Sequence, residues 1–449
     1  MVLSRSKFHF IGIGGIGMSG LAELLHNMGA TISGSDASEN EQIQKLKKLG
    51  ATIYKGHSKE NVGEVDTVVY SSAIPSTNPE LIEAKSRKIP IISRAEVLGE
   101  VMRLKRSIAV AGSHGKTTTT SMTASIFINA QVDPTVVVGG RLDLIKSNAF
   151  LGKGEWLIAE ADESDGSFKR LSPEISIITN IDDDHMDHYK TFDNLQKAFK
   201  EFANLIPFYG FCVVMGDDVR TRKLFENFDK RILFYGFHES NDFYLTKESS
   251  NGGMAYTIHH DGKKLGTFQL RIPGEHNALN ALSAFIVAYR CGIAAQKCIE
   301  GLEKFQGVDR RFQRLGEKNG VEIYDDYGHH PTEVKAVLKA FKEKYPKATI
   351  KVAFQPHRYS RTQSSWSDFL KAFDDCDELY LLDIYAASEA PIEGITSLKL
   401  SQEIKHKHCE YIGHVDNVLE KMLKAKPGEV FVTLGAGDIY KQGRKFLNL

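Results

Sequence analysis

The sequence predicts an α/β protein built from three domains. The chain has 449 residues, which corresponds to three domains of about 150 residues each. Short apolar runs alternate with helix-like segments along the chain, and many of these runs are followed by glycine-rich or polar turns. This order is typical of sheets whose strands are joined by crossover helices. We expect domains over residues 1–105, 106–309 and 310–449.

The composition argues against several classes of partner and location. The 57 basic residues balance 57 acidic ones, so the net charge offers no general attraction to nucleic acid or to an anionic membrane. No apolar run approaches the ~20 residues that cross a bilayer, so we expect no membrane insertion. The five cysteines include no CxxC pair, which favours reduced thiols and a cytoplasmic protein. The oligomeric state is left undetermined.

The first domain is expected to be a Rossmann-like parallel sheet. A strand over residues 8–13 leads into a turn that carries Gly12, Gly14 and Gly17, and a helix follows. This spacing lets backbone amides approach a pyrophosphate at the helix N-terminus. A second strand ends at Asp36, where such a sheet places an acid for ribose hydroxyls. The pattern indicates a nucleoside diphosphate without identifying the nucleoside, so NAD is one candidate.

The second domain is expected to be a P-loop ATPase-like α/β domain with added β hairpins. After a strand over residues 108–111, the loop places Gly115, Lys116 and Thr117 at the start of a helix. Such a loop supplies amide donors, a lysine for the β- and γ-phosphates and a hydroxyl for Mg²⁺. The loop is shorter than a full P-loop, because Val110 stands where the first glycine is expected. This departure favours a ligase-like variant. The hairpins are expected between residues 230 and 272.

Acidic residues follow the next two predicted strands of this domain. Glu160, Asp162, Glu163 and Asp165 come after the first of them, where a carboxylate can reach a Mg²⁺ ion. Residues 180–188, with the sequence NIDDDHMDH, follow the second. Its two histidines allow a zinc pair, but no third soft ligand is close in sequence, so we prefer one histidine near a Mg²⁺ site. Further along, Asn277 and Asn280 open a helix, as polar caps or as ligand contacts.

The third domain is expected to be a second Rossmann-like α/β domain. Arg310, Arg311 and Arg314 lie at its start, and they suit either a bound phosphate or a solvated salt-bridge face. Residues 325–331 and 355–362 each follow a predicted strand. Both segments are rich in histidine, arginine and acidic side chains, which bind anions or move protons.

The motifs resemble those of the Mur ligase family from end to end. In family order they read GIGGIGMSG, SSAIP, AGSHGKTTTTS, EADESDGSF, NIDDDHMDHY, GEHNALNA, RRFQ, DDYGHHPTE, HRYSRT and GAGDI. The resemblance implies domains for a UDP-sugar, for ATP and for an amino acid. It also implies a bacterial, cytoplasmic ATP-dependent ligation of L-alanine to UDP-N-acetylmuramate in peptidoglycan precursor synthesis, with two Mg²⁺ ions.

The resemblance also implies roles for individual residues. The expected catalytic residues are Lys116, Glu160, His185, Asn277, Asn280, Arg311 and Asp326. The expected ATP contacts are Gly112, Ser113, His114, Gly115, Lys116, Thr117, Thr118, Asn277 and Arg311. The expected UDP-sugar contacts are Gly14, Gly15, Ile16, Gly17, Asp36, Ser71, Ser72 and Ala73. The expected metal ligands are Thr117, Glu160 and His185. The residues expected to face the acyl group or the amino acid are His329, His330, Arg358 and Arg361.

Three other functions are compatible with parts of the sequence. Within the family, a recycling ligase would add a preformed peptide to the same sugar nucleotide. A nicotinamide-dependent dehydrogenase would use the segment from Gly12 to Asp36, but it would leave the second phosphate loop unexplained. A nucleotide-sensing protein would keep both loops and would not need the histidine and arginine segments of the third domain.

Overall fold

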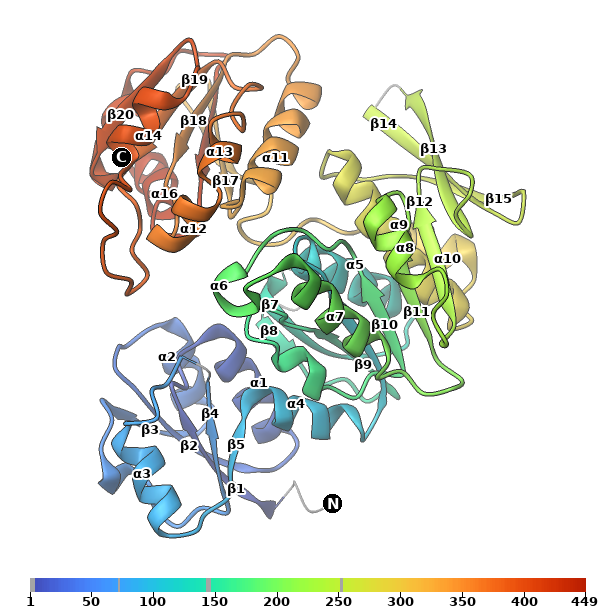
Figure 1. Ribbon diagram of the computed structural model, residues 1–449, viewed down its shortest axis with the longest axis vertical. Helices are drawn as coiled ribbons and strands as arrows, with labels where there is room; N and C mark the ends of the chain where they lie inside the picture. Colours follow the sequence, from blue (N-terminus) through green and yellow to red (C-terminus); the bar gives the residue numbers. More distant parts are fainter. Residues whose placement is uncertain (1–4, 72, 143–146, 251–252) are drawn as a thin grey trace. The chain divides into compact units, whose positions relative to one another are not determined.

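The computed structural model describes residues 5–71, 73–142, 147–250 and 253–449 (Figure 1). It contains a five-stranded, a ten-stranded and a six-stranded sheet. The chain forms two compact units. The first unit comprises Met1–Lys247, Tyr256–Phe268 and Leu279–Phe305, and the second comprises Glu248–Ala255, Gln269–Ala278 and Gln306–Leu449. The predicted α/β class is confirmed, whereas the predicted domain limits stay a prediction.

The first sheet is parallel throughout and has the strand order β3-β2-β1-β4-β5. Phe10 and Val69 pack on one face with helices α1, α2 and α4, whereas Ile11 and Val68 pack with α3 on the other. Adjacent residues of a strand point to opposite faces, so both faces are covered by helices. The elements are β1 Lys7–Ile11, α1 Ile16–Asn27, β2 Thr31–Asp36, α2 Glu41–Lys48, β3 Thr52–Lys55, η2 Lys59–Asn61, β4 Thr67–Tyr70, α3 Pro79–Ser86, β5 Ile91–Ser93 and α4 Arg94–Met102.

The second sheet has the order β15-β14-β13-β12-β11-β10-β6-β9-β7-β8. Its central strands pair in parallel, and β8 pairs antiparallel with β7. The three strands between residues 243 and 269 lie next to one another at one edge, where hairpins were expected. The strands are β6 Arg106–Ala111, β7 Thr135–Leu142, β8 Ser147–Phe150, β9 Trp156–Glu160, β10 Ile175–Ile178, β11 Phe211–Met215, β12 Ile232–Gly236, β13 Phe243–Ser250, β14 Gly253–His260 and β15 Lys263–Gln269. The helices are α5 Lys116–Asn129, η3 Ser167–Arg170, α6 Met186–Tyr189, α7 Phe192–Ala203, α8 Val219–Phe225, α9 Glu275–Arg290 and α10 Ala295–Glu303.

The third sheet has the order β16-β17-β21-β18-β19-β20, and only β16 runs antiparallel to its neighbour. Val352 and Phe354 pack with α11 on one face, whereas Ala353 and Phe431 pack with α15 and α16 on the other. The strands are β16 Gln313–Lys318, β17 Val321–Asp326, β18 Ile350–Phe354, β19 Glu378–Leu382, β20 Cys409–Gly413 and β21 Val430–Leu434. The helices are α11 Pro331–Lys344, α12 Tyr359–Ser364, α13 Trp366–Phe369, α14 Ser397–Glu403, η4 Val415–Asn417, α15 Val418–Leu423 and α16 Tyr440–Asn448.

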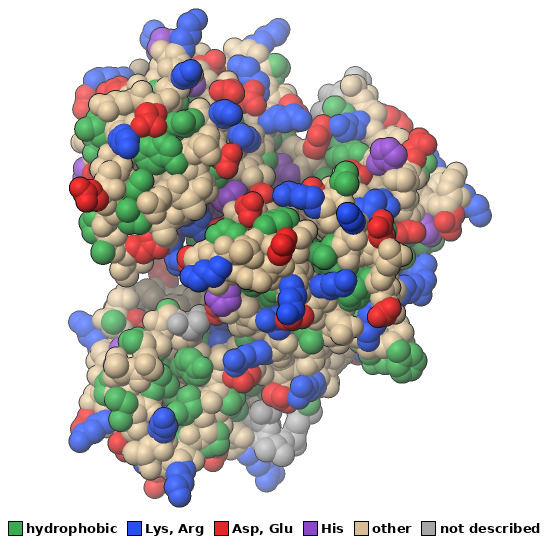
Figure 2. Space-filling model, viewed as in Figure 1, with side chains coloured by type: hydrophobic (Ala, Val, Ile, Leu, Met, Phe, Trp, Pro, Cys, Tyr) green, Lys and Arg blue, Asp and Glu red, His purple; other side chains and the backbone are tan. Residues whose placement is uncertain are grey.

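The surface agrees with the balanced charge of the sequence. Figure 2 shows basic and acidic side chains interspersed over the visible face. Within the described ranges, no helix combines the length and the apolar character needed to cross a bilayer. All five cysteines are free thiols.

Candidate active site

The phosphate loop lies between β6 and α5, as the sequence predicts. Gly115 has a φ of +84°, and a Cβ atom there would lie 2.7 Å from Oδ1 of Asn280. Glycine is favoured at such a position because it adopts positive φ without strain. The loop is also held from the segment after β10. The side chain of Asn180 accepts a hydrogen bond from the amide of His114 and donates one to its carbonyl, both at 2.9 Å. The side chain of Asn180 therefore holds the backbone of the loop in place.

Lys116 begins α5 and uses all three of its ammonium protons. Its Nζ atom lies 2.7 Å from the carbonyl of Gly112, 3.2 Å from that of Ser113 and 2.7 Å from Oε1 of Glu163. Burial acts to lower the pKa of Lys116, but the nearby carboxylates of Glu163, Asp162 and Glu160 outweigh it, and the pKa is raised. The side chain of Lys116 is therefore positively charged at neutral pH.

Thr117 and Glu160 form the second polar pair at this loop. The hydroxyl of Thr117 donates to the carboxylate oxygens of Glu160 at 3.0 and 3.1 Å. Hydroxyl and carboxylate oxygens are the ligands that Mg²⁺ prefers. Burial opposes ionisation of nearby Asp162, yet Lys116 and Arg94 prevail and hold its pKa below the usual value. The donor set fits a hard divalent cation.

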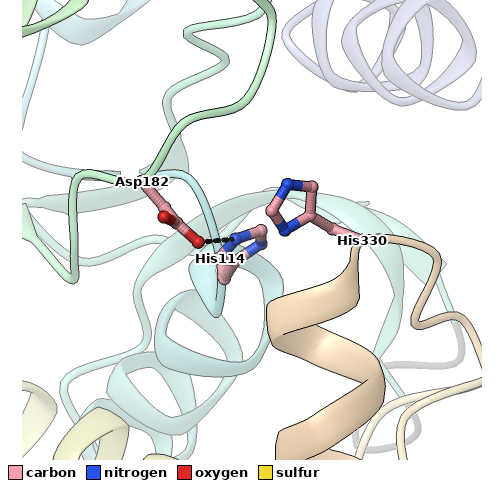
Figure 3. A group of neighbouring side chains, drawn as sticks. All are labelled: His114, Asp182 and His330. Atoms are coloured by element: carbon pink, nitrogen blue, oxygen red, sulfur yellow. Dashed lines mark hydrogen bonds and ion pairs between the residues drawn. The ribbon is translucent and has the colours of Figure 1, made fainter. Parts of the chain in front are cut away.

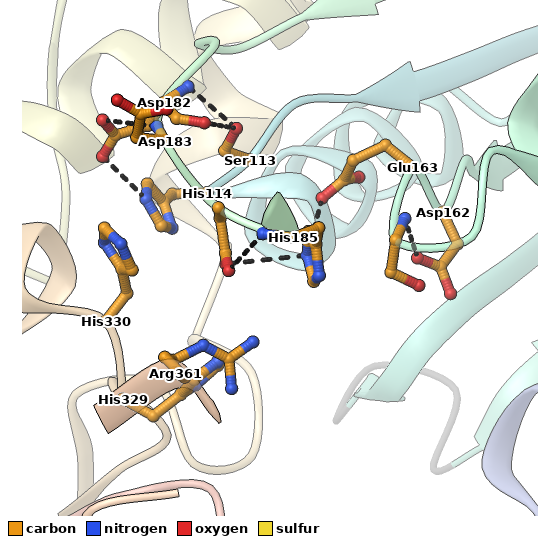
Figure 4. A network of polar contacts seen from close by, with 12 residues as sticks. Ser113, His114, Asp162, Glu163, Asp182, Asp183, His185, His329, His330 and Arg361 are labelled. Atoms are coloured by element: carbon orange, nitrogen blue, oxygen red, sulfur yellow. Dashed lines mark hydrogen bonds and ion pairs between the residues drawn. The ribbon is translucent and has the colours of Figure 1, made fainter. Parts of the chain in front are cut away.

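Asp182, in the acidic segment after β10, contacts two side chains of the loop. Nε2 of His114 lies 3.1 Å from Oδ2 of Asp182 (Figure 3). The amide of Asp182 donates to the hydroxyl of Ser113 at 2.9 Å (Figure 4). Thr118, the last predicted loop residue, is buried. These contacts join the loop to the strand that neighbours β6.

His185 is the histidine that turns toward the acids. Its φ is +59°, and its amide donates to Oδ1 of Asp184 at 2.7 Å. Its Nε2 atom lies 3.5 Å from Oε1 of Glu163 (Figure 4). His188 is exposed, and its ring packs edge-on against Tyr189 with a centroid distance of 4.7 Å. Only His185 is therefore placed toward Glu163, which favours the single-histidine interpretation over a zinc pair.

The glycine fingerprint and Asp36 come together in the first sheet. Oδ2 of Asp36 accepts a hydrogen bond from the amide of Gly14 at 2.8 Å, and Asn40 donates to the carbonyl of Gly14 at 3.0 Å. The turn leads directly into α1, since Gly15 is its N-cap. Ile16 is half exposed, at 51% of its accessible surface. Asp36 therefore orders the loop that was expected to meet a diphosphate.

Ser71 and Ala73 follow β4, which pairs in parallel with β1, the strand before this loop. In the turn after β4, the amide of Ala73 donates to the hydroxyl of Ser71 at 3.4 Å, and Ser72 lies outside the described residues. A Cβ atom on Gly17 would lie 2.8 Å from Nη1 of Arg94, so a side chain there would displace the guanidinium group. Sequence reasoning missed Arg94, which also lies 3.6 Å from Asp162. No motif pointed to it, because it lies in an ordinary helix start.

In the second unit, Asp326 and Arg311 occupy neighbouring turns. Asp326 ends β17, and its two carboxylate oxygens accept from the amides of Gly328 and Phe312, both at 2.7 Å. Burial raises the pKa of Asp326 to about 6 although Arg311 favours the charged form. Nη1 of Arg311 lies 3.5 Å from Oε1 of Glu333.

The remaining candidates of this unit differ in their surroundings. Nδ2 of Asn277 donates to the carbonyl of Pro273 at 2.7 Å. His330 is buried and caps α11, since its Nδ1 accepts from the amide of Thr332 at 3.4 Å. Nδ1 of His329 lies 3.1 Å from the carbonyl of Tyr327. Asn277, His329 and His330 therefore have different polar partners, and the contacts do not assign them one common role.

Arg358 and Arg361 lie close to His357, which was not among the residues predicted for the site. Arg358 has a φ of +69°, and its Nε atom is buried without a hydrogen-bond partner. Nη1 of Arg361 lies 3.4 Å from Nδ1 of His357. Burial, followed by the two arginines, lowers the pKa of His357 to about 4, so this ring is neutral at neutral pH. An unpartnered buried guanidinium nitrogen suits an anionic ligand.

The strand, phosphate loop and helix with a lysine, a threonine and a carboxylate from the next strand define a nucleotide-binding α/β enzyme. Three family models match nearly the whole chain. They are "Mur ligase family, catalytic domain" over residues 7–106, "Mur ligase middle domain" over residues 110–288 and "Mur ligase, glutamate ligase domain" over residues 310–437. The chain therefore belongs to the Mur ligase family, as its motifs predicted. It is in consequence an ATP-dependent ligase, of a family that uses Mg²⁺.

Relatives and solved structures agree with this assignment. The chain is 58% identical to a UDP-N-acetylmuramate–L-alanine ligase of Bdellovibrio bacteriovorus, and the match covers 100% of both chains. It is 46% identical to the ligase of that name in Desulfatibacillum aliphaticivorans, with 100% and 99% covered. The crystal structure of the UDP-N-acetylmuramate–alanine ligase of Thermotoga maritima matches at 30% identity and a TM-score of 0.84, with 99% of each chain covered. A murein peptide ligase of Psychrobacter arcticus shares the fold at 24% identity and a TM-score of 0.73, with 99% and 98% covered.

Proposed function

We propose that this protein joins L-alanine to the lactyl carboxylate of UDP-N-acetylmuramate, with conversion of ATP to ADP and phosphate. The observation that carries the proposal is the 58% identity to a ligase of that name over the full length of both chains. Two glycine-rich loops in the first unit, each at a helix N-terminus, support the proposal, since a sugar nucleotide and ATP together would need two phosphate sites. A nicotinamide dehydrogenase would use only one of them.

The chemistry requires activation of the carboxylate, because a carboxylate is a poor electrophile. We propose that its oxygen attacks the γ-phosphate of ATP, which gives an acyl phosphate and ADP. The amine of L-alanine then attacks the acyl carbon and phosphate leaves. Lys116 and Arg311 would stabilise the negative charge on the transferring phosphoryl group. Lys116 belongs to the first compact unit and Arg311 to the second.

We propose Thr117, Glu160 and His185 as the residues that hold two Mg²⁺ ions. When bound, Mg²⁺ neutralises phosphate charge and aligns the attacking and leaving oxygens. The short contacts between Thr117 and Glu160 support the first part of this set. The position of His185 beside the buried carboxylate of Glu163 supports the second.

The three family segments would then divide the substrates among them. We propose UDP-sugar binding by residues 1–105, ATP binding by residues 106–309 and amino-acid binding by residues 310–449. The ordered Gly14 turn supports the first assignment, and the buried, unpartnered Nε of Arg358 supports a carboxylate contact in the third. We propose that the reaction takes place in the bacterial cytoplasm, and the five free thiols support a reducing location.

We propose supporting roles for the other residues of the set. In the first unit, Asn280 would contact ATP, because its side chain lies beside Gly115. In the second unit, Asn277 would contact ATP, and Asp326 would complete the reaction site next to Arg311. His329, His330 and Arg361 would face the acyl group or the amino acid.

The test is phosphate release from ATP and Mg²⁺ in the presence of UDP-N-acetylmuramate. L-alanine, glycine, L-serine and a preformed L-Ala-γ-D-Glu-diaminopimelate tripeptide are compared. We expect release to be fastest with L-alanine, to be lost in Lys116→Ala and to persist in Lys297→Ala, a surface control that pairs with Glu300. Release with the tripeptide alone would move the assignment to a recycling ligase. Release that is independent of the amine would contradict both.

A further inference from the structure

Glu163 is a buried carboxylate with one oxygen unused. The residue has no accessible surface, and its backbone is fixed because its carbonyl accepts from the amide of Gly166 at 2.9 Å and from the hydroxyl of Tyr189. Its Oε1 atom makes both side-chain contacts, 2.7 Å to Nζ of Lys116 and 3.5 Å to Nε2 of His185. Its Oε2 atom is buried without a hydrogen-bond partner. Such an oxygen is costly unless a ligand or an ion meets it.

The same contacts imply that Glu163 changes its partner when a nucleotide binds. Lys116 has three ammonium protons, and all three are engaged by Gly112, Ser113 and Glu163. A contact to a nucleotide phosphate must replace one of them. Gly112 and Ser113 belong to the same loop as Lys116, whereas Glu163 lies on the segment after β9. A Lys116 that turns to a phosphate leaves Glu163 buried without its counter-charge, so another cation has to take the place of the ammonium.

We propose that Glu163 and His185 together bind a divalent metal ion, at a position that Lys116 neutralises until a nucleotide draws it away. This inference rests on the proposed function, since it adds a carboxylate ligand to the ion assigned to His185. The carboxylate oxygen is a ligand that Mg²⁺ and Mn²⁺ prefer, and the imidazole nitrogen adds a ligand of the kind that binds divalent first-row transition metals. In Figure 4 the carboxylate of Glu163 and the ring of His185 face each other. The consequence is an order of binding, with the nucleotide before the second ion.

The experiment counts Mn²⁺ bound to the full-length protein by electron paramagnetic resonance, with and without the non-hydrolysable analogue β,γ-imido-ATP. With the analogue, the wild type is expected to bind a second Mn²⁺ that it does not bind alone. Glu163→Gln and His185→Asn should each weaken this second ion by at least about tenfold and spare the first. Glu201→Gln makes the same change on the exposed partner of Lys169 and serves as the matched control.

Lys116→Met provides the complementary test, because it removes the ammonium that neutralises Glu163. This variant should bind Mn²⁺ at the second position without any nucleotide, and Lys116→Met with Glu163→Gln should not. Thermal melting of each variant reports its folding.

Three outcomes would overturn the inference. If Glu163→Gln keeps the second Mn²⁺ at wild-type affinity, Glu163 is not a ligand, and the proposed function stands. If Lys116→Met binds no ion without nucleotide, the exchange between Lys116 and the metal is wrong. If the wild type binds a single Mn²⁺ with the analogue, the two-ion part of the proposed function fails together with this inference, and amine-dependent phosphate release then tests the ligase activity separately.

Discussion

The hydroxyl of Thr117 donates to both carboxylate oxygens of Glu160, at 3.0 and 3.1 Å. The two residues are 43 positions apart. They meet because β9 pairs in parallel with β6, with Glu160 in register with Val110. The strand before the phosphate loop and the strand that ends in the acid therefore finish at one sheet edge. This is the edge at which open α/β sheets bind ligands.

Replacement of Thr117 by valine should weaken Mg²⁺ binding. The side chain keeps its shape but loses the hydroxyl that fixes Glu160. We expect the Mg²⁺ concentration for half-maximal phosphate release to rise about ten- to a hundred-fold. Thr123→Val is the matched control, since the hydroxyl of Thr123 donates only to a carbonyl of its own helix. An unchanged Mg²⁺ dependence in Thr117→Val would exclude Thr117 from the metal site.

Replacement of Gly115 by alanine should damage the phosphate loop in two ways. The φ of +84° costs an L-residue about 1–2 kcal/mol. The new Cβ would also lie 2.7 Å from Oδ1 of Asn280. Gly50→Ala separates the two effects, because Gly50 has a φ of +98° and nothing within 4 Å of its Cβ position. We expect Gly115→Ala to lower the melting temperature more than Gly50→Ala and, unlike it, to weaken nucleotide binding. Equal melting temperatures would show that the contact with Asn280 costs nothing.

Asp326 should make the protein less stable as the pH rises from about 4 to 6. Burial raises the pKa of this carboxyl to about 6, so the folded state holds a proton that the unfolded state has already released in this range. The loss is absent below pH 4 and complete above pH 6, and it amounts to about 3 kcal/mol. The melting temperature of the wild type should fall relative to Asp326→Asn across this range. Asp375→Asn, an exposed site, should follow the wild type. Parallel curves for the wild type and Asp326→Asn would contradict this prediction.

Glu80 should act with the opposite sign in the first sheet. Burial favours its neutral form, but hydrogen bonds from His9, Ser35 and Asn61 lower its pKa to about 2. Its stabilisation is fully present above pH 4.5 and is lost as the pH falls toward 2. We expect Glu80→Gln to cost about 3 kcal/mol at pH 7. The difference in melting temperature from the wild type should narrow between pH 5 and 3. Glu64→Gln, on the surface, should melt as the wild type does, and a constant difference for Glu80→Gln would refute the assignment.

Much of the fold could be predicted because its signals are local. A buried strand followed by a glycine turn and a helix is encoded within about thirty residues. The strand predicted to end at Asp36 does so as β2, and the strand predicted over residues 108–111 lies within β6 and ends with it at Ala111. The antiparallel edge strand β16 was not predicted, because an edge strand is half exposed and lacks a continuous apolar run.

The sequence by itself determined the α/β class, the family and the two glycine-rich loops, since these depend on residue order along short segments. Only the tertiary structure decided which side chains meet. The EADESD segment offers four acids of similar chemistry, but Glu160 contacts Thr117 and Glu163 contacts Lys116 and His185. That choice depends on strand register and on the burial of one carboxylate. Both arise from packing between distant segments, which no local pattern encodes.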